Sequence, residues 1–194
     1  MEIIFATNNK NKVSEVQQLL SNSIQLKSLQ DIGCFEDIPE TSDTIEGNAL
    51  QKANYVYQMY KENCFSDDTG LEVEALGNAP GVHSARYAGE DRSDFKNIEK
   101  LLNELDGQNN RKARFKTVIA LVLNGKVITF EGIANGEILK ERRGENGFGY
   151  DPVFVPNGQT KTFAEMTLSE KNKFSHRAKA FQKLVEFLTR NVSK

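Results

Sequence analysis

The sequence is poor in the residues and patterns that would assign it to a class at once. It has only two cysteines, Cys34 and Cys64, and their spacing suits neither a metal site nor a redox pair. We therefore expect both to be reduced, in a cytoplasmic protein. The 25 basic and 27 acidic residues leave a net charge of −2, so no overall positive field would attract a nucleic-acid partner. No signal peptide, membrane span, internal repeat or long linker is expected.

What is present is the composition of a globular protein with alternating strands and helices. Of the 194 residues, 38% are hydrophobic and 27% are charged, which suits one domain, or one domain with two lobes. The apolar periodicity predicts a strand at 2–6, then a helix with Val13, Val16, Leu19 and Leu20 on one face, a helix at about 44–62 and a strand at 64–66. A helix from Ser93 to before Gly107 and a hairpin of 114–123 and 127–133 should follow. The last predicted elements are a capping box at 167–170 and a closing helix with Ala178, Phe181, Leu184, Val185 and Leu188. We predict an α/β fold with a mixed sheet.

Two adjacent carboxylates, Asp67 and Asp68, are the most informative feature of the chain. They follow an apolar segment and precede Thr69 and Gly70, so we predict a strand that ends in a tight turn at the glycine. Consecutive residues of an extended chain point to opposite faces, so one aspartate can anchor the loop while the other faces a ligand. Carboxylate oxygens suit Mg²⁺, which also keeps water and phosphate oxygens as ligands. The alternative is an ordinary solvated turn.

A polar loop separates the first predicted strand from the first predicted helix. Loops at the carboxyl ends of strands are where α/β proteins bind ligands, and a helix N-terminus attracts anions. Hydroxyl, amide and lysine groups suit phosphates, although the glycines of a Walker A loop are absent. The candidate phosphate-binding residues are Thr7, Asn8, Asn9, Lys10, Asn11 and Lys12. The alternative is a polar loop that only caps the helix.

Three further segments carry residues of interest. Glu40 precedes the second predicted helix and Lys52 lies two turns into it; either residue alone would usually be solvated surface. Segment 144–152 has three glycines around two aromatic residues, so its backbone can approach a ligand while a ring stacks on a planar base. The alternative is that the aromatic rings fill the core. His176 and Arg177 fall in the first turn of the last helix, where positive charge gains nothing from the helix dipole, and hydrogen bonding to a base would explain them.

Taken together, these segments closely resemble the inosine triphosphate pyrophosphatase family, which hydrolyses noncanonical purine nucleoside triphosphates such as dITP and XTP. The resemblance extends from Thr7 to Arg177, and its motifs occur in the expected order. They are Thr7-Asn8-Asn9-x-x-Lys12, Asn48-Ala49-x-x-Lys52-Ala53, Ser66-Asp67-Asp68-Thr69-Gly70-Leu71, Pro80-Gly81-x-x-Ser84-Ala85-Arg86-Tyr87, Gly147-Phe148-Gly149-Tyr150-Asp151-Pro152 and Ser175-His176-Arg177.

The resemblance implies an elongated central mixed sheet flanked by helices, in a single two-lobed domain over residues 1–194 with a nucleotide cleft between the lobes. It also implies a homodimer and a requirement for Mg²⁺. Glu40 and Asp68 would face the metal, and Asp68 would also accept the proton of the attacking water. The implied substrate-binding residues are Thr7, Asn8, Asn9, Lys10, Asn11, Lys12, Lys52 and Thr69, together with a base pocket of Phe148, Gly149, Tyr150, Asp151, Lys171, His176 and Arg177.

The expected reaction is attack of water on the α-phosphorus of ITP, dITP or XTP, which releases pyrophosphate and a nucleoside monophosphate. Lys12 and Lys52 would stabilise the charge that develops on the leaving group. Donors in the base pocket would recognise the 6-oxo group that adenine lacks. Two alternatives stay open: a hydrolase of pyrimidine or modified nucleotides, and a nucleotide- or RNA-binding module without catalysis. A purely structural domain would leave the clustered motifs unexplained.

Overall fold

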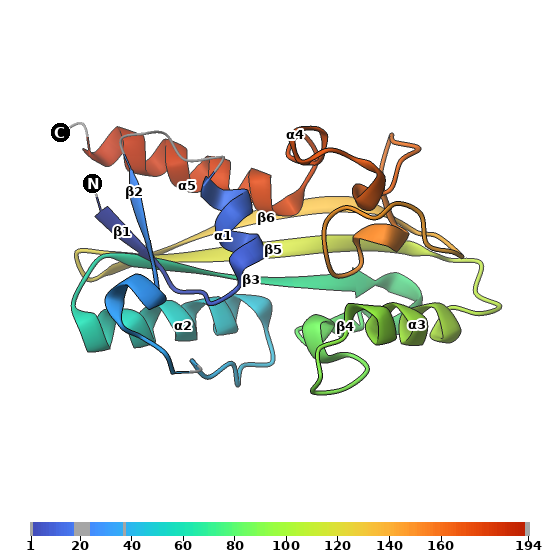
Figure 1. The fold of residues 1–194 in the computed structure, drawn as a ribbon, viewed down its shortest axis with the longest axis horizontal. Coiled ribbons are helices and arrows are strands. Elements are labelled where there is room, and N and C mark those ends of the chain that lie inside the picture. Colours follow the sequence, from blue (N-terminus) through green and yellow to red (C-terminus); the bar gives the residue numbers. More distant parts are fainter. Residues whose placement is uncertain (1, 18–23, 37, 193–194) are drawn as a thin grey trace. The chain divides into compact units, whose positions relative to one another are not determined.

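The computed structural model describes residues 2–17, 24–36 and 38–192, which form a seven-stranded sheet with helices packed against it (Figure 1). The helices are α1 (Lys10–Gln17), α2 (Ile45–Tyr60), α3 (Asp94–Glu104), α4 (Leu168–Lys171) and α5 (His176–Val192). The strands are β1 (Glu2–Phe5), β2 (Gln25–Ser28), β3 (Cys64–Val73), β4 (Pro80–Gly81), β5 (Lys112–Leu123), β6 (Lys126–Ile138) and β7 (Phe154–Pro156). Short 3₁₀ helices lie at Gln30–Ile32, Glu74–Leu76, Ser84–Arg86, Asp151–Val153 and Phe163–Glu165. None of the described helices is long and apolar enough to span a lipid bilayer.

The sheet combines parallel and antiparallel strands. Its strand order is β2-β1-β3-β5-β6-β7, and β4 pairs with β3 outside this path. β1 runs parallel to both β2 and β3, whereas β4 and β7 run antiparallel to β3 and β6. The predicted α/β fold with a mixed sheet is therefore confirmed.

Local signals set the ends of several elements. The side chains of Thr44 and Ser93 cap α2 and α3 by accepting backbone hydrogen bonds from the first turn. Asn124 and Gly125 both have positive φ, as the two-residue turn between β5 and β6 requires. The capping box predicted at Thr167 is present at the start of α4. Residues 19 and 20, which were expected on the first helix, lie outside the described residues.

The tight turn predicted at Gly70 is wrong. β3 continues through Asp67, Asp68 and Gly70 to Val73 without interruption, and Gly70 is not among the residues with positive φ. β4 pairs with the far part of β3 at Leu71, and the side chains of Leu71 and Val73 are fully buried. Strand pairing and burial therefore outweigh the conformational freedom of the glycine, and the two aspartates lie in the middle of a strand.

The chain divides into two compact units that interleave in the sequence. Unit 1 consists of Met1–Asp68, Thr117–Gly132 and Arg177–Lys194, and unit 2 consists of Thr69–Lys116 and Ile133–His176. Strands β3, β5 and β6 each contribute residues to both units. The division is consistent with two lobes, whereas the elongated shape and the cleft remain predictions.

In unit 1, the core on one face of the sheet is built from aromatic rings. Phe5 of β1 stacks on Phe65 of β3 with a centroid separation of 4.6 Å, and Phe181 of α5 packs edge-on against both rings. On the opposite face, α2 packs through the small buried residues Ala49 and Ala53 (Figure 1). Small side chains let the α2 backbone approach β3 closely, which places the polar residues of α2 beside that strand.

In unit 2, a second aromatic core lies under a different helix. Phe115, Phe154 and Phe163 pack together with centroid separations between 4.7 and 6.1 Å. Helix α3 adds Ile98 and Leu101 to this cluster. Each unit therefore has its own hydrophobic core, and each core supports its own group of polar residues.

Candidate active site

The end of β1 brings the loop at residues 7–12 beside the middle of β3. Phe5, the last residue of β1, pairs with Phe65 in the parallel ladder. β3 continues beyond this pair, so Asp67 and Asp68 lie on the stretch that β1 no longer covers. The carboxyl end of a parallel strand is where α/β sheets place ligand-binding loops. This topology explains why Lys12 meets Asp67 although the two are 55 positions apart.

The alternation of β3 sends its polar side chains to opposite faces of the sheet. Oγ of Ser66 donates a hydrogen bond to a backbone carbonyl of α2. Asp67, the next residue, pairs with Arg177 in the first turn of α5, and Asp68 returns to the α2 side near Lys52. The prediction that the two aspartates point to opposite faces is confirmed, whereas contact of one of them with a ligand remains a prediction.

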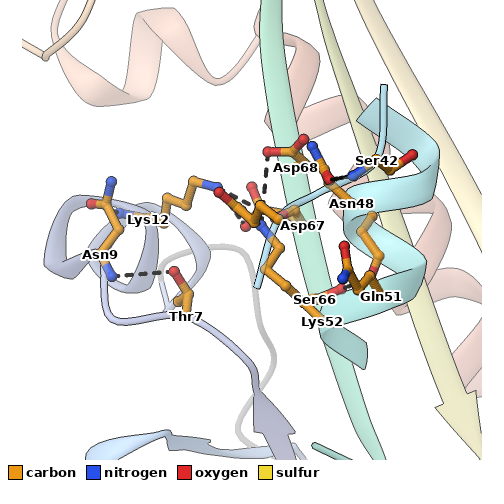
Figure 2. Close-up of polar contacts among 12 residues, drawn as sticks. Thr7, Asn9, Lys12, Ser42, Asn48, Gln51, Lys52, Ser66, Asp67 and Asp68 are labelled. Carbon is orange, nitrogen blue, oxygen red and sulfur yellow. Dashed lines mark hydrogen bonds and ion pairs between the residues drawn. The ribbon is translucent and has the colours of Figure 1, made fainter. Parts of the chain in front are cut away.

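Asp67 is a fully buried carboxylate held between two cations. Its Oδ1 accepts a hydrogen bond from Nζ of Lys12 at 2.9 Å (Figure 2), and its Oδ2 lies 3.5 Å from Nε of Arg177. Burial raises the pKa of Asp67, but Lys12 and Arg177 outweigh this effect and hold the pKa below its ordinary value. Burial also lowers the pKa of Lys12, and Asp67 opposes that shift. Asp67 is thus an ionised anchor inside the protein.

Lys52 lies between two other carboxylates. Its Nζ donates a hydrogen bond to Oε1 of Glu40 and lies 3.7 Å from Oδ1 of Asp68 (Figure 2). Burial lowers the pKa of Lys52, yet Asp68 and Glu40 together raise it above its ordinary value. Lys52 therefore remains a cation and links the two acidic side chains.

Helix α2 also fixes the segment that carries Glu40. Oδ1 of Asn48 accepts a hydrogen bond from the backbone N–H of Ser42 at 2.9 Å (Figure 2). Oε1 of Gln51 accepts one from the backbone N–H of Thr41 at 3.0 Å. These two amides hold residues 41 and 42 against the helix, so Glu40 is presented to Lys52 by a tethered backbone.

Asp68 has one oxygen that the described residues do not satisfy. Its Oδ2 is buried and accepts no hydrogen bond from them. Burial raises the pKa of Asp68 above its ordinary value despite the nearby Lys52 and Lys12. A buried acceptor without a partner is costly, because it has lost its hydrogen bonds to water. Asp68 is therefore suited to bind a group that a ligand brings.

The donor set fits a metal ion that is shared with a phosphate ligand. Within the described ranges, no three histidine, cysteine, aspartate or glutamate side chains gather into a metal cluster. Mg²⁺ usually binds one or two carboxylates and completes its shell with water and phosphate oxygens. Glu40 and Asp68 supply two carboxylates, and the unbonded Oδ2 of Asp68 suits a cation. The residues do not form a closed structural metal site.

The loop before α1 is ordered by its own side chains. Oγ1 of Thr7 accepts a hydrogen bond from the backbone N–H of Asn9 at 3.2 Å (Figure 2). Oδ1 of Asn9 accepts one from the backbone N–H of Lys12 at 3.3 Å, as a helix cap does. Part of this loop therefore caps the helix, and Lys12 is the loop residue that reaches the buried charges.

The second polar group lies in unit 2 and centres on a single buried ion pair. Nζ of Lys171, on α4, donates to Oδ2 of Asp151 at 2.8 Å, and both side chains are at most 6% exposed. The same Oδ2 accepts a hydrogen bond from the backbone N–H of Phe148 at 3.0 Å. A Cβ atom on Gly147 would lie 2.0 Å from Oδ2 of Asp151, so only glycine fits there. Asp151 thus shapes the backbone of the glycine-rich segment.

Aromatic rings surround this ion pair. Nζ of Lys171 lies 5.2 Å from the ring centroid of the half-buried Phe148. The imidazole of His176 is 3% exposed and stacks on Phe115 with a centroid separation of 4.6 Å. The ring of Tyr150 is buried, and its hydroxyl donates to the backbone carbonyl of Ser84, so this aromatic does fill the core. Burial raises the pKa of that phenol.

Comparison with known proteins decides the family. The model of the Ham1 family matches residues 3–187. The chain belongs to the Ham1 family.

Curated relatives of this Ham1-family chain share a name. The dITP/XTP pyrophosphatase of Flavobacterium psychrophilum is 58% identical over 187 residues, which cover 96% of this chain and 98% of the relative. The dITP/XTP pyrophosphatase of Bacillus subtilis is 47% identical and covers 96% of each chain. The resemblance inferred from the sequence motifs is therefore confirmed at the level of the family.

Solved structures of Ham1 proteins share the fold. The Ham1 protein of Staphylococcus aureus superposes with a TM-score of 0.91 at 38% identity, covering 98% of this chain and 100% of that one. A nucleoside-triphosphatase, dITP/XTP pyrophosphatase, of Mycobacterium abscessus superposes with a TM-score of 0.79 at 40% identity, covering 95% of this chain and 99% of that one. The central mixed sheet flanked by helices is thus a property of the family.

The predicted site residues of this Ham1-family chain fall into two groups. The first group, in unit 1, contains Thr7, Asn8, Asn9, Lys12, Glu40, Lys52, Asp68 and Arg177. The second, in unit 2, contains Thr69, Phe148, Gly149, Tyr150, Asp151, Lys171 and His176. The side chains of Lys10 and Asn11 lie outside the part that the structure describes. Arg177 was expected in the base pocket but pairs with Asp67, so its contact with a base remains a prediction.

Two further residues contact members of these groups but were not assigned to the site from the sequence. Asp67 was assigned no role in the predicted site, yet it contacts two predicted substrate-binding residues, Lys12 and Arg177. Asp94, at the start of α3, accepts a hydrogen bond from the backbone N–H of Gly149 at 2.7 Å. The alternation of β3 was a usable signal for Asp67. No local signal connects Asp94 to a glycine that lies 55 positions away.

Proposed function

We propose that this chain hydrolyses noncanonical purine nucleoside triphosphates, namely ITP, dITP and XTP, to the nucleoside monophosphate and pyrophosphate. The observation that carries the proposal is the carboxylate of Asp68, which is partly exposed beside Lys52 and whose buried Oδ2 accepts no hydrogen bond from the described residues. The relatives support the substrate class, because the proteins that this chain matches over nearly their full length are called dITP/XTP pyrophosphatases. The reaction would remove these nucleotides from the nucleotide pool.

The catalytic residue of the proposal is Asp68. It orients a water molecule toward the α-phosphorus and accepts its proton as the new P–O bond forms and the bond to the bridging oxygen of the pyrophosphate breaks. Burial raises the pKa of Asp68. A neighbouring Mg²⁺ would lower it again, so orientation of the water is the main role proposed for this carboxylate. Glu40 and Asp68 would hold Mg²⁺, which would supply positive charge to the phosphate oxygens.

The phosphate-binding residues would be those of the first group. Thr7, Asn9 and the N-terminus of α1 offer donors, and Lys12 and Lys52 offer positive charge. Both ammonium groups are largely shielded from water, with side chains 13% and 10% exposed, so their attraction for a leaving pyrophosphate is weakly screened.

The base-binding residues would be those of the second group. Phe148 is half-buried and can stack on a purine. Nζ of Lys171 lies 5.2 Å from the centroid of its ring, and both Lys171 and His176 contact the ring of Phe163 in the same unit. Donors there would pair with the 6-oxo group of hypoxanthine or xanthine and would be left unpaired by adenine. A site built on such hydrogen bonds can discriminate by about 10⁴-fold. Thr69, the first residue of unit 2, would also contact the substrate.

The proposal extends to assembly and location. The two cysteines, Cys34 and Cys64, are free and buried, which supports a reducing compartment such as the cytoplasm. A homodimer is part of the proposal through the family resemblance. No stable nucleic-acid partner is proposed, because the net charge is −2.

The test is a comparison of pyrophosphate and orthophosphate release from ITP, XTP, GTP and ATP, with Mg²⁺ and with EDTA. We expect metal-dependent release of pyrophosphate from ITP and XTP, with GTP and ATP nearly untouched. Release of orthophosphate would place the attack at the γ-phosphorus and refute the mechanism. Equal turnover of ATP would refute the specificity. Binding of ITP without turnover would indicate a nucleotide-binding module.

A further inference from the structure

The proposed reaction makes no use of Asp67, although this side chain has no exposed surface and contacts two proposed substrate-binding residues. We propose that Asp67 is a positioning residue that aims the ammonium group of Lys12 at the phosphates of the substrate. The identity of that substrate rests on the proposed function. The inference itself concerns only how Lys12 is held.

The geometry of Lys12 supports this role. A lysine ammonium has three N–H donors. Oδ1 of Asp67 lies 2.9 Å from Nζ, and the backbone carbonyl oxygen of Asp67 lies 3.4 Å from it. Both acceptors belong to one residue in the middle of β3, a paired strand of the sheet. Two donors are therefore directed by a rigid element, and the third has a defined direction for a phosphate oxygen.

The position of Asp67 is itself determined by a second cation. Oδ2 of Asp67 lies 3.5 Å from Nε of Arg177, whose side chain is 4% exposed. The carboxylate therefore has a cation at each of its two oxygens. Rotation of the carboxylate would separate it from Lys12 or Arg177 and leave a buried charge uncompensated, which is costly. The two ion pairs therefore fix the orientation of the carboxylate. Lys12, on the first turn of α1, is thereby connected through Asp67 to the first turn of α5.

A positioning role and a purely electrostatic role predict opposite results. Asp67 is an anion close to the proposed binding site of another anion. By Coulomb's law alone, removal of its charge would strengthen the binding of phosphates. If Asp67 instead orients Lys12, its loss frees the flexible four-carbon side chain of the lysine, and phosphate binding becomes weaker. The sign of the change therefore discriminates between the two roles.

The experiment measures the affinity of the full-length protein for inorganic pyrophosphate by calorimetry, for wild type, Asp67→Asn, Lys12→Ala and the double variant. We expect Asp67→Asn to weaken binding about tenfold, the loss of one hydrogen bond to a charged group. We expect the double variant to match Lys12→Ala within about twofold, because Asp67 acts through Lys12. Unchanged or tighter binding by Asp67→Asn, or fully additive losses in the double variant, would overturn the proposal.

Two further variants keep the test decisive. Glu72→Gln is the matched control, since Glu72 lies on the same strand, pairs with Arg114, and should leave pyrophosphate affinity unchanged. Melting temperatures check that each variant is folded. If Asp67→Asn does not fold, Asp67→Glu keeps the charge and moves it by one methylene. It should show the same loss of affinity, and wild-type affinity would contradict the positioning role.

The outcome separates this inference from the proposed function. Wild-type protein that binds pyrophosphate but leaves ITP intact would refute the proposed function and leave the positioning test standing. Wild-type protein that hydrolyses ITP, together with an Asp67→Asn variant of unchanged pyrophosphate affinity, would refute the positioning role alone. If the wild-type protein binds no pyrophosphate, the positioning role is overturned whether or not ITP is hydrolysed.

Discussion

Asp68 in unit 1 and Asp151 in unit 2 are both carboxylates beside a lysine, and each has a buried Oδ2, but the two oxygens differ in their hydrogen bonds. Oδ2 of Asp151 accepts two hydrogen bonds, from Lys171 and from the backbone of Phe148. Oδ2 of Asp68 accepts none from the described residues. A satisfied buried carboxylate fixes the shape of the chain around it, whereas an unsatisfied one is available to a ligand. The comparison supports the proposal that the first group carries out the chemistry and the second recognises the base.

The largest effect should come from Asp68→Asn, which tests the chemical half of this comparison. We expect turnover of ITP to fall by on the order of 10²–10⁴-fold or more, because the amide cannot accept the proton of the attacking water. The dissociation constant for ITP should change little, since the lysines remain in place. Single-turnover pyrophosphate release and calorimetry measure the two quantities. Near-normal kcat in this variant would contradict the catalytic role of Asp68.

The recognition half of the comparison is tested by Lys171→Met. The change leaves Asp151 buried without its cation, so we expect the free energy of unfolding to fall by about 3–5 kcal/mol. Urea denaturation measures this loss. The matched control is Lys96→Met, which breaks an exposed pair with Asp91 and should leave the free energy of unfolding nearly unchanged. Equal losses in the two variants would mean that the Asp151–Lys171 pair has no structural importance.

Arg177→Ala tests to which of the two groups Arg177 belongs, because this residue was expected to contact the base but pairs with Asp67 in unit 1. We expect KM for ITP to rise about tenfold, as for the loss of a charged hydrogen bond, and the preference for ITP over ATP to decrease. Steady-state kcat/KM values for both nucleotides provide the measurement. A preference that stays constant while pyrophosphate affinity falls would assign Arg177 to the phosphate group of residues only.

The smallest effect concerns the helix that carries Lys171. Hydrogen bonds from the backbone N–H of Thr167 and from Lys161 lower the pKa of Glu170 from 4.5 to about 2. Because the folded pKa is depressed, the stabilisation is present above pH 4.5 and is lost as the pH falls toward 2. Glu170→Gln should therefore flatten the dependence of melting temperature on pH in that window. Glu186→Gln, on α5, is the control, and an equal flattening there would contradict the effect.

Local patterns predicted much of the fold, because caps and turns depend on neighbouring residues. Thr44, Ser93 and the Asn124-Gly125 turn were readable from a few positions each. The alternation of an extended chain predicted that Asp67 and Asp68 point to opposite faces. The turn at Gly70 was wrong, because pairing with β4, a distant segment, decides that backbone.

The sequence proposed residues for the site but could not predict their contacts. Family motifs selected Lys12, Lys52 and Asp68, and the overall resemblance added Lys171. The partners of these residues come from elements far apart in the sequence, so spacing could not predict that Lys12 meets Asp67 or that Lys171 meets Asp151. Asp94 carries no motif at all, and only the folded chain places it against Gly149.

The interleaving of the two units limits how this protein can be divided. The boundaries fall after Asp68 in β3, within β5 and β6, and between His176 and Arg177. No single cut of the gene yields either unit as one uninterrupted fragment, and cuts at the first three boundaries sever a strand. Recombination with a relative should therefore exchange blocks that end in the loops and leave β3, β5 and β6 intact. Any exchange of unit 2 would therefore have to include strands that also build unit 1.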